Sequence, residues 1–201
     1  MKKLSLLLIL SFLFISINAQ FFEGKIVYKI KLKNSTITKN ILFKGNRCRI
    51  ETSFANIKFP KYSVIINNEL YFIDKNMRII LKDTSSNNTF NDNFIKLNKK
   101  EVLLGYKCSV YKNSIENTNN KNLIFITVAN SLETDIKIPS IAVKGNIILK
   151  TIQKNSDYQY TMEVVKIIPM RLDKNLFKLP EYPIREVSMA AMVGQVILES
   201  K

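Results

Sequence analysis

The most informative absence in this 201-residue sequence is histidine, of which it has none. Without histidine the chain cannot build a Ser-His-Asp triad, a Cys-His nucleophile pair or a histidine-held haem. Its two cysteines are too few for an all-cysteine zinc site, and histidine-bearing zinc sites are excluded as well. We therefore expect no metal centre and no cofactor.

Carboxylates are the acid–base groups that remain. Glu51, Glu69, Asp74 and Glu101 lie on or beside expected strands, where solvated surface acids are usual. A glycosidase needs two carboxyls at a defined separation in a cleft, and the sequence does not place these four together. The acids from Asp83 to Asp92 lack the spacing of an EF-hand calcium loop. We therefore expect a protein that is not an enzyme, with a carboxylate hydrolase as a minor alternative.

Acidic residues are scarce: 16 Asp and Glu stand against 31 Lys and Arg, a formal net charge of +15. Two interpretations of this excess are open. A basic surface attracts anionic lipid headgroups or acidic polymers. Translation of an AT-rich genome also yields a chain rich in Lys, Asn and Ile. We expect no nucleic-acid partner, because no motif mixes aromatic and basic residues.

The first 19 residues have the three parts of a secretory signal peptide. Lys2 and Lys3 form a basic start, Leu4 to Ile17 form an apolar run, and Ala19 is a small residue at the cleavage position. A membrane anchor is the alternative, but the run is shorter than the roughly 20 residues that a spanning helix needs. We expect cleavage near Ala19, a mature chain without a transmembrane span, and a periplasmic or secreted location.

Cys48 and Cys108 are an even pair in a chain expected to reach an oxidising compartment. A disulfide between them would stabilise the fold by roughly 4 kcal/mol in the chain-entropy model. Two buried free thiols that pack as small hydrophobes are the alternative. Their spacing is not the CxxC of a redox site, and the sequence leaves both interpretations open.

Helical periodicity is almost absent before residue 170, whereas apolar and polar residues alternate in short segments bounded by turns. Residues 83 to 95 are polar and predict a loop. About ten strands are expected, at Phe22–Lys33, Ile37–Lys44, Arg47–Thr52, Tyr62–Ile66, Glu69–Asp74, Met77–Lys82, Glu101–Lys112, Asn122–Ala129, Ile141–Gln153 and Tyr158–Ile168. This pattern predicts a mainly β, antiparallel single domain over residues 20–201.

Two short helical segments are expected near the C-terminus. The first runs from Leu172 to Leu176, with Asp173 as a cap. The second covers residues 187–198 and is rich in methionine and small residues. It either closes over a cavity or packs as a terminal helix or strand.

Apolar and aromatic residues on the expected strands are candidates for a ligand cavity, with core packing as the alternative use of the aromatic rings. Methionines of the C-terminal segment join them. The candidates are Tyr28, Ile30, Ile50, Leu81, Phe125, Tyr160, Met162, Met189 and Met192.

Four motifs occur in order between Gln20 and Pro183. They are Phe22-Glu23-Gly24-Lys25-Ile26-Val27-Tyr28, Arg47-Cys48-Arg49-Ile50-Glu51, Leu104-Gly105-Tyr106-Lys107-Cys108 and Phe177-Lys178-Leu179-Pro180-Glu181-Tyr182. As a set they resemble a family of exported Bacteroidetes proteins of unknown function, related to the periplasmic lipoprotein carriers of the LolA/LolB type. The segment from Ile138 to Leu149 also looks like the GLPGLI family of exported proteins, without its full signature.

The resemblance implies a strongly curved antiparallel sheet, a half-barrel partly closed by helices or loops. In the carriers, the concave apolar face of this sheet holds acyl chains. The helical lid segments of a typical carrier are not evident between residues 50 and 100. We expect an exported, non-catalytic protein that binds a lipid, a lipoprotein acyl chain or another apolar ligand. A structural or protein-interaction component of the cell envelope, with an envelope protein as its partner, is the alternative.

Overall fold

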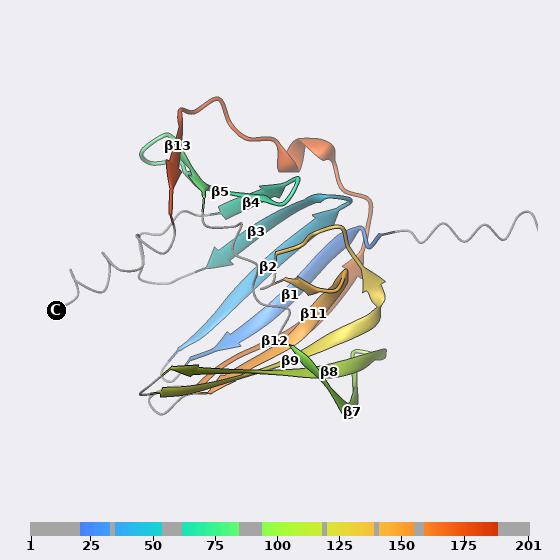
Figure 1. Cartoon of the computed structure of the whole chain (residues 1–201). Helices are drawn as coiled ribbons and strands as arrows, with labels where there is room; N and C mark the ends of the chain where they lie inside the picture. The colour runs from blue at the N-terminus through green and yellow to red at the C-terminus, as the bar shows by residue number, and fades with distance from the viewer. Residues whose placement is uncertain are drawn as a thin grey trace, which may run out of the picture.

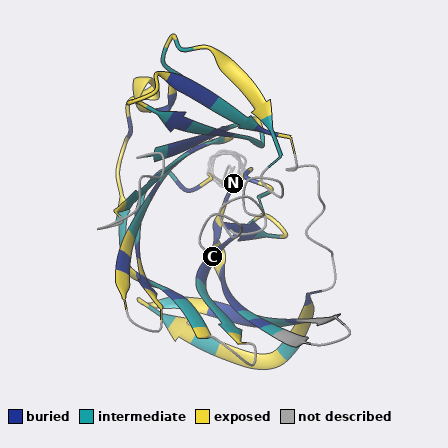
Figure 2. Ribbon diagram, turned by 90° about the vertical axis from the view of Figure 1, so that its left-hand side faces the viewer, coloured by how far each residue is buried: buried dark blue, intermediate teal, exposed yellow. Residues whose placement is uncertain are grey.

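A computed structural model describes residues 21–32, 35–53, 62–84, 94–117, 120–138, 141–154 and 159–188. These residues form one sheet of 13 strands and a single short 3-10 turn (Figure 1). Figure 2 shows that the sheet curves into an open C. The expectation of a mainly β chain with a curved sheet and few helical residues is confirmed, and the sheet is larger than the expected half-barrel. The expected signal peptide lies outside the described residues.

The strands follow one another mostly as antiparallel neighbours, in the order β13-β6-β5-β4-β3-β2-β1-β12-β11-β9-β8-β7, with β10 paired to β11. Their bounds are β1 (Gly24–Lys31), β2 (Thr36–Lys44), β3 (Arg47–Ser53), β4 (Tyr62–Ile66), β5 (Glu69–Asp74), β6 (Ile79–Asp83), β7 (Ile95–Leu103), β8 (Tyr106–Asn117), β9 (Asn120–Glu133), β10 (Ala142–Val143), β11 (Asn146–Lys154), β12 (Gln159–Pro169) and β13 (Ile184–Val187).

The two faces of the sheet follow from strand alternation, because directly opposite partners on neighbouring strands point to the same side. One row of partners crosses seven strands, from β6 to β12: Leu81, Phe72, Ser63, Ile50, Ile41, Ile26 and Ile167. The main buried cluster joins residues of this row with residues of β8, β9 and β11. A cluster that unites both arms of the C must lie on its concave side.

A second, smaller core lies on the convex side of strands β3 to β6. After β12 the chain crosses this side, where Leu172 and Phe177 pack against Val64, Ile73 and Ile80. The 3-10 turn η2 (Lys174–Phe177) carries Phe177, which is fully buried. The expected cap of this turn is confirmed, because the Asp173 side chain accepts a hydrogen bond from the backbone N–H of Asn175.

Two expected strands are wrong because each is a hairpin. The segment Glu101–Lys112 is divided between β7 and β8, and Ile141–Gln153 between β10 and β11. Both turns are an Xaa-Gly pair with positive φ: 49° and 85° at Leu104-Gly105, and 52° and 77° at Lys144-Gly145. Residues in this left-handed region cannot continue a strand. The Asn67-Asn68 turn between β4 and β5 is confirmed, with φ of 51° and 66°.

The sequence predicts a wholly antiparallel sheet, but one pair of strands in the structure is parallel. The last strand, β13, pairs in parallel with β6, with Ile184 opposite Ile80 and Val187 opposite Asp83. Val187 therefore ends a strand rather than beginning the expected helix at 187–198, whose residues from Met189 onward lie outside the described part of the chain. No helix among the described residues is long and apolar enough to cross a membrane.

Candidate ligand-binding face

The concave face of the sheet carries the main buried apolar cluster of the described residues. Its fully buried centre includes Ile26, Ile41 and Phe43, each with no exposed side chain. Around this centre lies a rim of partly buried apolar residues that pack against it: Ile50, Leu70, Leu103, Tyr106, Ile138, Tyr160 and Ile167. The face therefore combines a dry centre with an apolar rim that is accessible in part.

A lysine, Lys39, stands within this apolar face. It lies on β2 between Ile37 and Ile41, and its partners on the neighbouring strands are Tyr28 and Thr52. Alternation along β2 puts Lys39 on the same side as Ile37, Ile41 and the other concave residues. Within the described part of the chain, its ammonium group forms no ion pair and no hydrogen bond.

Burial controls the charges around Lys39. It lowers the pKa of the Lys39 ammonium, because the group loses water without gaining a counter-ion. Burial also raises the pKa of the Tyr28 phenol and of the Cys48 thiol, the two titratable neighbours, so both stay neutral at neutral pH. The concave face therefore presents, at Lys39, an amino group whose charge its own neighbours do not compensate when it is protonated.

Tyr28 has its polar atom satisfied inside the molecule. Its hydroxyl donates a 2.8 Å hydrogen bond to the backbone carbonyl of Ile148 on β11. Strands β1 and β11 are not neighbours in the sheet, since β12 lies between them. This buried bond therefore links β1 to β11 across β12 beside Lys39, and the phenol proton is engaged and not available to a ligand's anion.

The two cysteines are free thiols, both buried in the concave cluster. The sequence left a disulfide and two free thiols open. In the structure Cys48 on β3 and Cys108 on β8 are free thiols that pack as small hydrophobes. The hydrogen bond that the Cys108 thiol donates to the backbone carbonyl of Tyr106 is local, at 3.2 Å.

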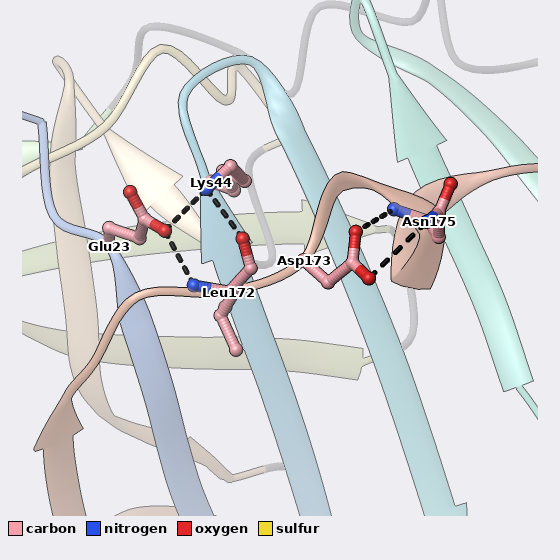
Figure 3. Close-up of polar contacts among 5 residues, drawn as sticks. All are labelled: Glu23, Lys44, Leu172, Asp173 and Asn175. Carbon is pink, nitrogen blue, oxygen red and sulfur yellow. Dashed lines mark hydrogen bonds and ion pairs between the residues drawn. The ribbon is translucent and has the colours of Figure 1, made fainter.

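A polar junction closes the end of the sheet where β1 begins (Figure 3). The Glu23 carboxylate lies 2.5 Å from the Lys44 ammonium and accepts a 2.6 Å hydrogen bond from the backbone N–H of Leu172. Lys44 also donates to the Leu172 carbonyl, at 2.6 Å. The Lys44 hydrogen bond is the main cause that lowers the pKa of Glu23. The junction thus holds the chain where it leaves β12 for the convex side.

A pocket of about 380 Å³ opens beside this junction, lined by Phe21, Phe22, Glu23, Pro169, Met170 and Arg171. The Phe22 ring lines this pocket and also contacts the Phe43 ring edge-to-face, with ring centroids 5.9 Å apart. Phe22 belongs to the concave cluster. The pocket therefore adjoins the concave face at one end of the sheet.

The structure brings most of the described cavity candidates to one face. Tyr28, Ile30 and Met162 are buried in the concave cluster, and Ile50 and Tyr160 pack against it. Leu81 continues the same face toward β13, as the end of the row that contains Ile50. Met189 and Met192 lie outside the described residues.

Phe125 is the exception among these candidates. Phe125 on β9 lies opposite Ile152 on β11. Ile152 in turn lies opposite Thr161 on β12, and Thr161 lies opposite Lys31 on β1. Lys31 is exposed and lies on the side of β1 away from Tyr28 and Ile30. Phe125 therefore lies on the convex face and cannot line a concave cavity.

Lys39 was not among the sequence candidates, although a signal for it exists. In the run Ile37-Thr38-Lys39-Asn40-Ile41, the lysine has the parity of the two isoleucines. Alternating lysines elsewhere in the chain, as in β1, lie on the outer face. The parity of its own strand predicts the inner face.

The carboxylates considered for acid–base chemistry each have a local partner. Glu51, Glu69 and Glu101 form ion pairs with Arg or Lys side chains at 2.7–2.9 Å. Asp74 accepts hydrogen bonds from two backbone N–H groups of the turn that follows β5. In the described ranges, no three side chains of the metal-binding types come together.

Comparison with known proteins gives likeness of fold alone. No family model matches the chain, and no curated protein matches it. Among solved structures, PNGF-II in its P21 crystal form has a TM-score of 0.58 at 14% identity, covering 87% of this chain and 33% of that chain. The chain thus spans about a third of the length of PNGF-II.

Two further solved structures have TM-scores below 0.5. A LolA superfamily protein from Nitrosomonas europaea has a TM-score of 0.39 at 9% identity, covering 81% of this chain and 92% of that chain. LprF from Mycobacterium bovis has 0.36 at 6% identity, covering 79% and 90%. The expected membership of the exported Bacteroidetes family stays a prediction.

Proposed function

We propose that the chain is a non-catalytic binding protein that holds a lipid or another apolar ligand against the concave face of its sheet. The observation that carries this proposal is the buried apolar cluster on the concave side, which joins residues of both arms of the open C and has a partly buried apolar rim. Ligand sites of this kind are concave and mostly apolar, with few polar groups to orient the ligand. The rim residues Ile50 and Tyr160 are placed to contact such a ligand without unfolding the centre.

The cellular setting of this proposal follows from the N-terminal sequence. A cleaved signal peptide before Gln20 would deliver the protein to the periplasm or the outside of the cell. Apolar molecules such as acyl chains need a carrier or a holder in that aqueous space. Lipids and lipoprotein acyl chains are the ligands that we propose there.

The test is native mass spectrometry of the protein purified after export from a bacterial host, followed by solvent extraction. We expect an acyl-chain compound to co-purify, or to bind when a long-chain alcohol is added. Tyr160→Gln, on the concave rim, should lower the bound fraction, whereas Phe125→Gln, on the convex face, should not. A protein that carries nothing and takes up no acyl chain would contradict the proposal.

One observation favours a second candidate function, contact with an envelope protein. In the described part of the chain, β7 ends the strand order, so one of its sides lacks a neighbouring strand. Ile95 and Val102 on this strand are 71% and 67% exposed. An edge with unpaired backbone groups can accept a strand from a partner. Capture of one envelope protein at equal stoichiometry, lost in Val102→Glu, would support this candidate.

A further inference from the structure

We infer that the ligand of the concave face is an anionic amphiphile, whose charged end group pairs with Lys39 and whose acyl chain lies along the apolar rows of the sheet. This inference rests on the proposed function and adds the chemical class of the ligand. The end group is a carboxylate or a phosphate, since either forms a charge-assisted hydrogen bond with an ammonium group.

The first observation is the contrast between Lys39 and other lysines of the sheet. Lys44, Lys82, Lys99 and Lys150 each lie within 4.0 Å of a glutamate carboxylate. Lys39 has no such partner among the described residues, although Ile37, Ile41 and Tyr28 beside it are buried. A buried charge without a partner costs free energy, and an anionic ligand would offset this cost.

The second observation concerns the groups that face Lys39 from the neighbouring strands. The Tyr28 hydroxyl on β1 donates its hydrogen bond to the Ile148 carbonyl, and Cys48 on β3 is a buried thiol. Thr52, directly opposite on β3, adds a hydroxyl but no charge. No carboxylate on these strands competes for Lys39 on the concave side, so a ligand's anion meets an uncompensated cation in a medium of low dielectric constant.

The third observation is the extent of apolar surface beside Lys39. From β2 the concave face continues over β1, β12, β11 and β9. Four steps at the usual strand spacing of about 4.8 Å amount to about 19 Å. An acyl chain that fills one leaflet of a bilayer spans about 15 Å. With its end group at Lys39, such a chain therefore matches the length of this row of strands.

The experiment compares oleate, oleoyl lysophosphatidate and the neutral oleyl alcohol by calorimetric titration of the whole protein. We expect one or both anions to bind at least about tenfold more tightly than the alcohol, the value of one charged hydrogen bond. Lys39→Met should remove this preference and leave the affinity for the alcohol unchanged. Lys39→Arg should retain it. Lys29→Met, which removes an exposed lysine of β1 from the outer face, is the matched control and should bind like the wild type.

The outcomes separate this inference from the proposed function. If the alcohol and the anions bind equally, and Lys39→Met changes neither, the inference is overturned while the proposed function stands. If no acyl compound binds the wild type at all, the proposed function itself fails. A preference for oleate over the lysophosphatidate, or the reverse, supports the inference and identifies the end group. Far-UV circular dichroism of each variant checks that it is folded.

Discussion

Replacing Lys39 by methionine should stabilise the ligand-free protein. The substitution keeps an unbranched side chain of similar length and removes the charge that the concave face surrounds with Ile37, Ile41 and Tyr28. Lysine at this position is destabilising because its ammonium loses water and finds no partner among the described residues. Methionine fills the same space with apolar atoms.

The magnitude follows from the partial burial of the side chain. A polar group that is buried without a partner costs about 1–3 kcal/mol. Because Lys39 is only partly buried, we expect the lower end, about 1 kcal/mol in the free energy of unfolding. For a domain of this size that raises Tm by about 2–4 °C. Urea unfolding and differential scanning calorimetry measure both quantities, and Lys29→Met should change the free energy by less than about 0.5 kcal/mol.

The effect should depend on pH in one direction. The pKa of Lys39 is lowered in the folded state from its usual 10.5, so between the two values the unfolded chain binds more protons than the folded one. Stability of the wild type therefore rises with pH in that window, relative to a variant without the group. The advantage of Lys39→Met should be full below the lowered folded-state pKa and shrink as the pH rises from there toward 10.5.

A specific result would refute this reasoning. If Lys39→Met unfolds at lower urea concentration than the wild type, Lys39 has a stabilising partner in the free protein. The uncompensated charge would then not exist, and the inferred anion site would lose its basis. Equal stability of Lys39→Met and the wild type at all pH values would likewise contradict the burial of the ammonium group.

Three further predictions concern the framework around the concave face. Phe177→Ala should lower the free energy of unfolding by about 3–5 kcal/mol in urea, because it empties the centre of the convex core. Tyr28→Phe should cost about 1–2 kcal/mol in the same assay, since it leaves the buried Ile148 carbonyl without its donor. Glu23→Gln should cost about 1 kcal/mol above the ordinary glutamate pKa of 4.5 and progressively less as the pH falls through the lowered folded-state pKa, because a carboxylate whose pKa is lowered by Lys44 stabilises the fold only while it is ionised. Urea midpoints of Glu23→Gln and the wild type that stay parallel from pH 3 to pH 7 would contradict that ion pair.

Alternation along single strands predicted much of the sheet. In β1, the inner positions of Ile26, Tyr28 and Ile30 follow from period two alone, and the structure buries all three. The same rule, applied to the strand that holds it, predicts Lys39 on the inner side. The information that places Lys39 on the inner side is therefore local, because the lysine has the parity of Ile37 and Ile41 in its own strand.

Alternation fails where apolar residues are continuous. Ile124, Phe125 and Ile126 follow one another without a polar residue, so the sequence does not show which of them face the concave side. Cross-strand register decides that question, and it places Phe125 with Lys31 on the outside. The parallel pairing of β13 with β6 likewise depends on the path of residues 170–183 over the convex core.

Turns at unusual residues were the other source of error. Leu104 adopts a positive φ of 49°, which leucine rarely does, and only Gly105 after it indicates a turn. Gly24 is the opposite case, because a contact with another strand, and not a local turn, requires glycine at this position. A Cβ atom there would lie 2.3 Å from the backbone carbonyl of Ile168 on β12, a contact that no local pattern predicts.

The measurement that tests the central claim most directly uses the lack of tryptophan. Tyr160→Trp puts a single fluorophore on the concave rim, and Phe125→Trp puts one on the convex face, so each replaces one partly buried aromatic residue. Dibromostearate quenches tryptophan on contact. If an acyl chain binds to the concave face, it should quench Trp at position 160 in a saturable way and leave Trp at position 125 bright. Equal quenching of both, or of neither, would contradict the account.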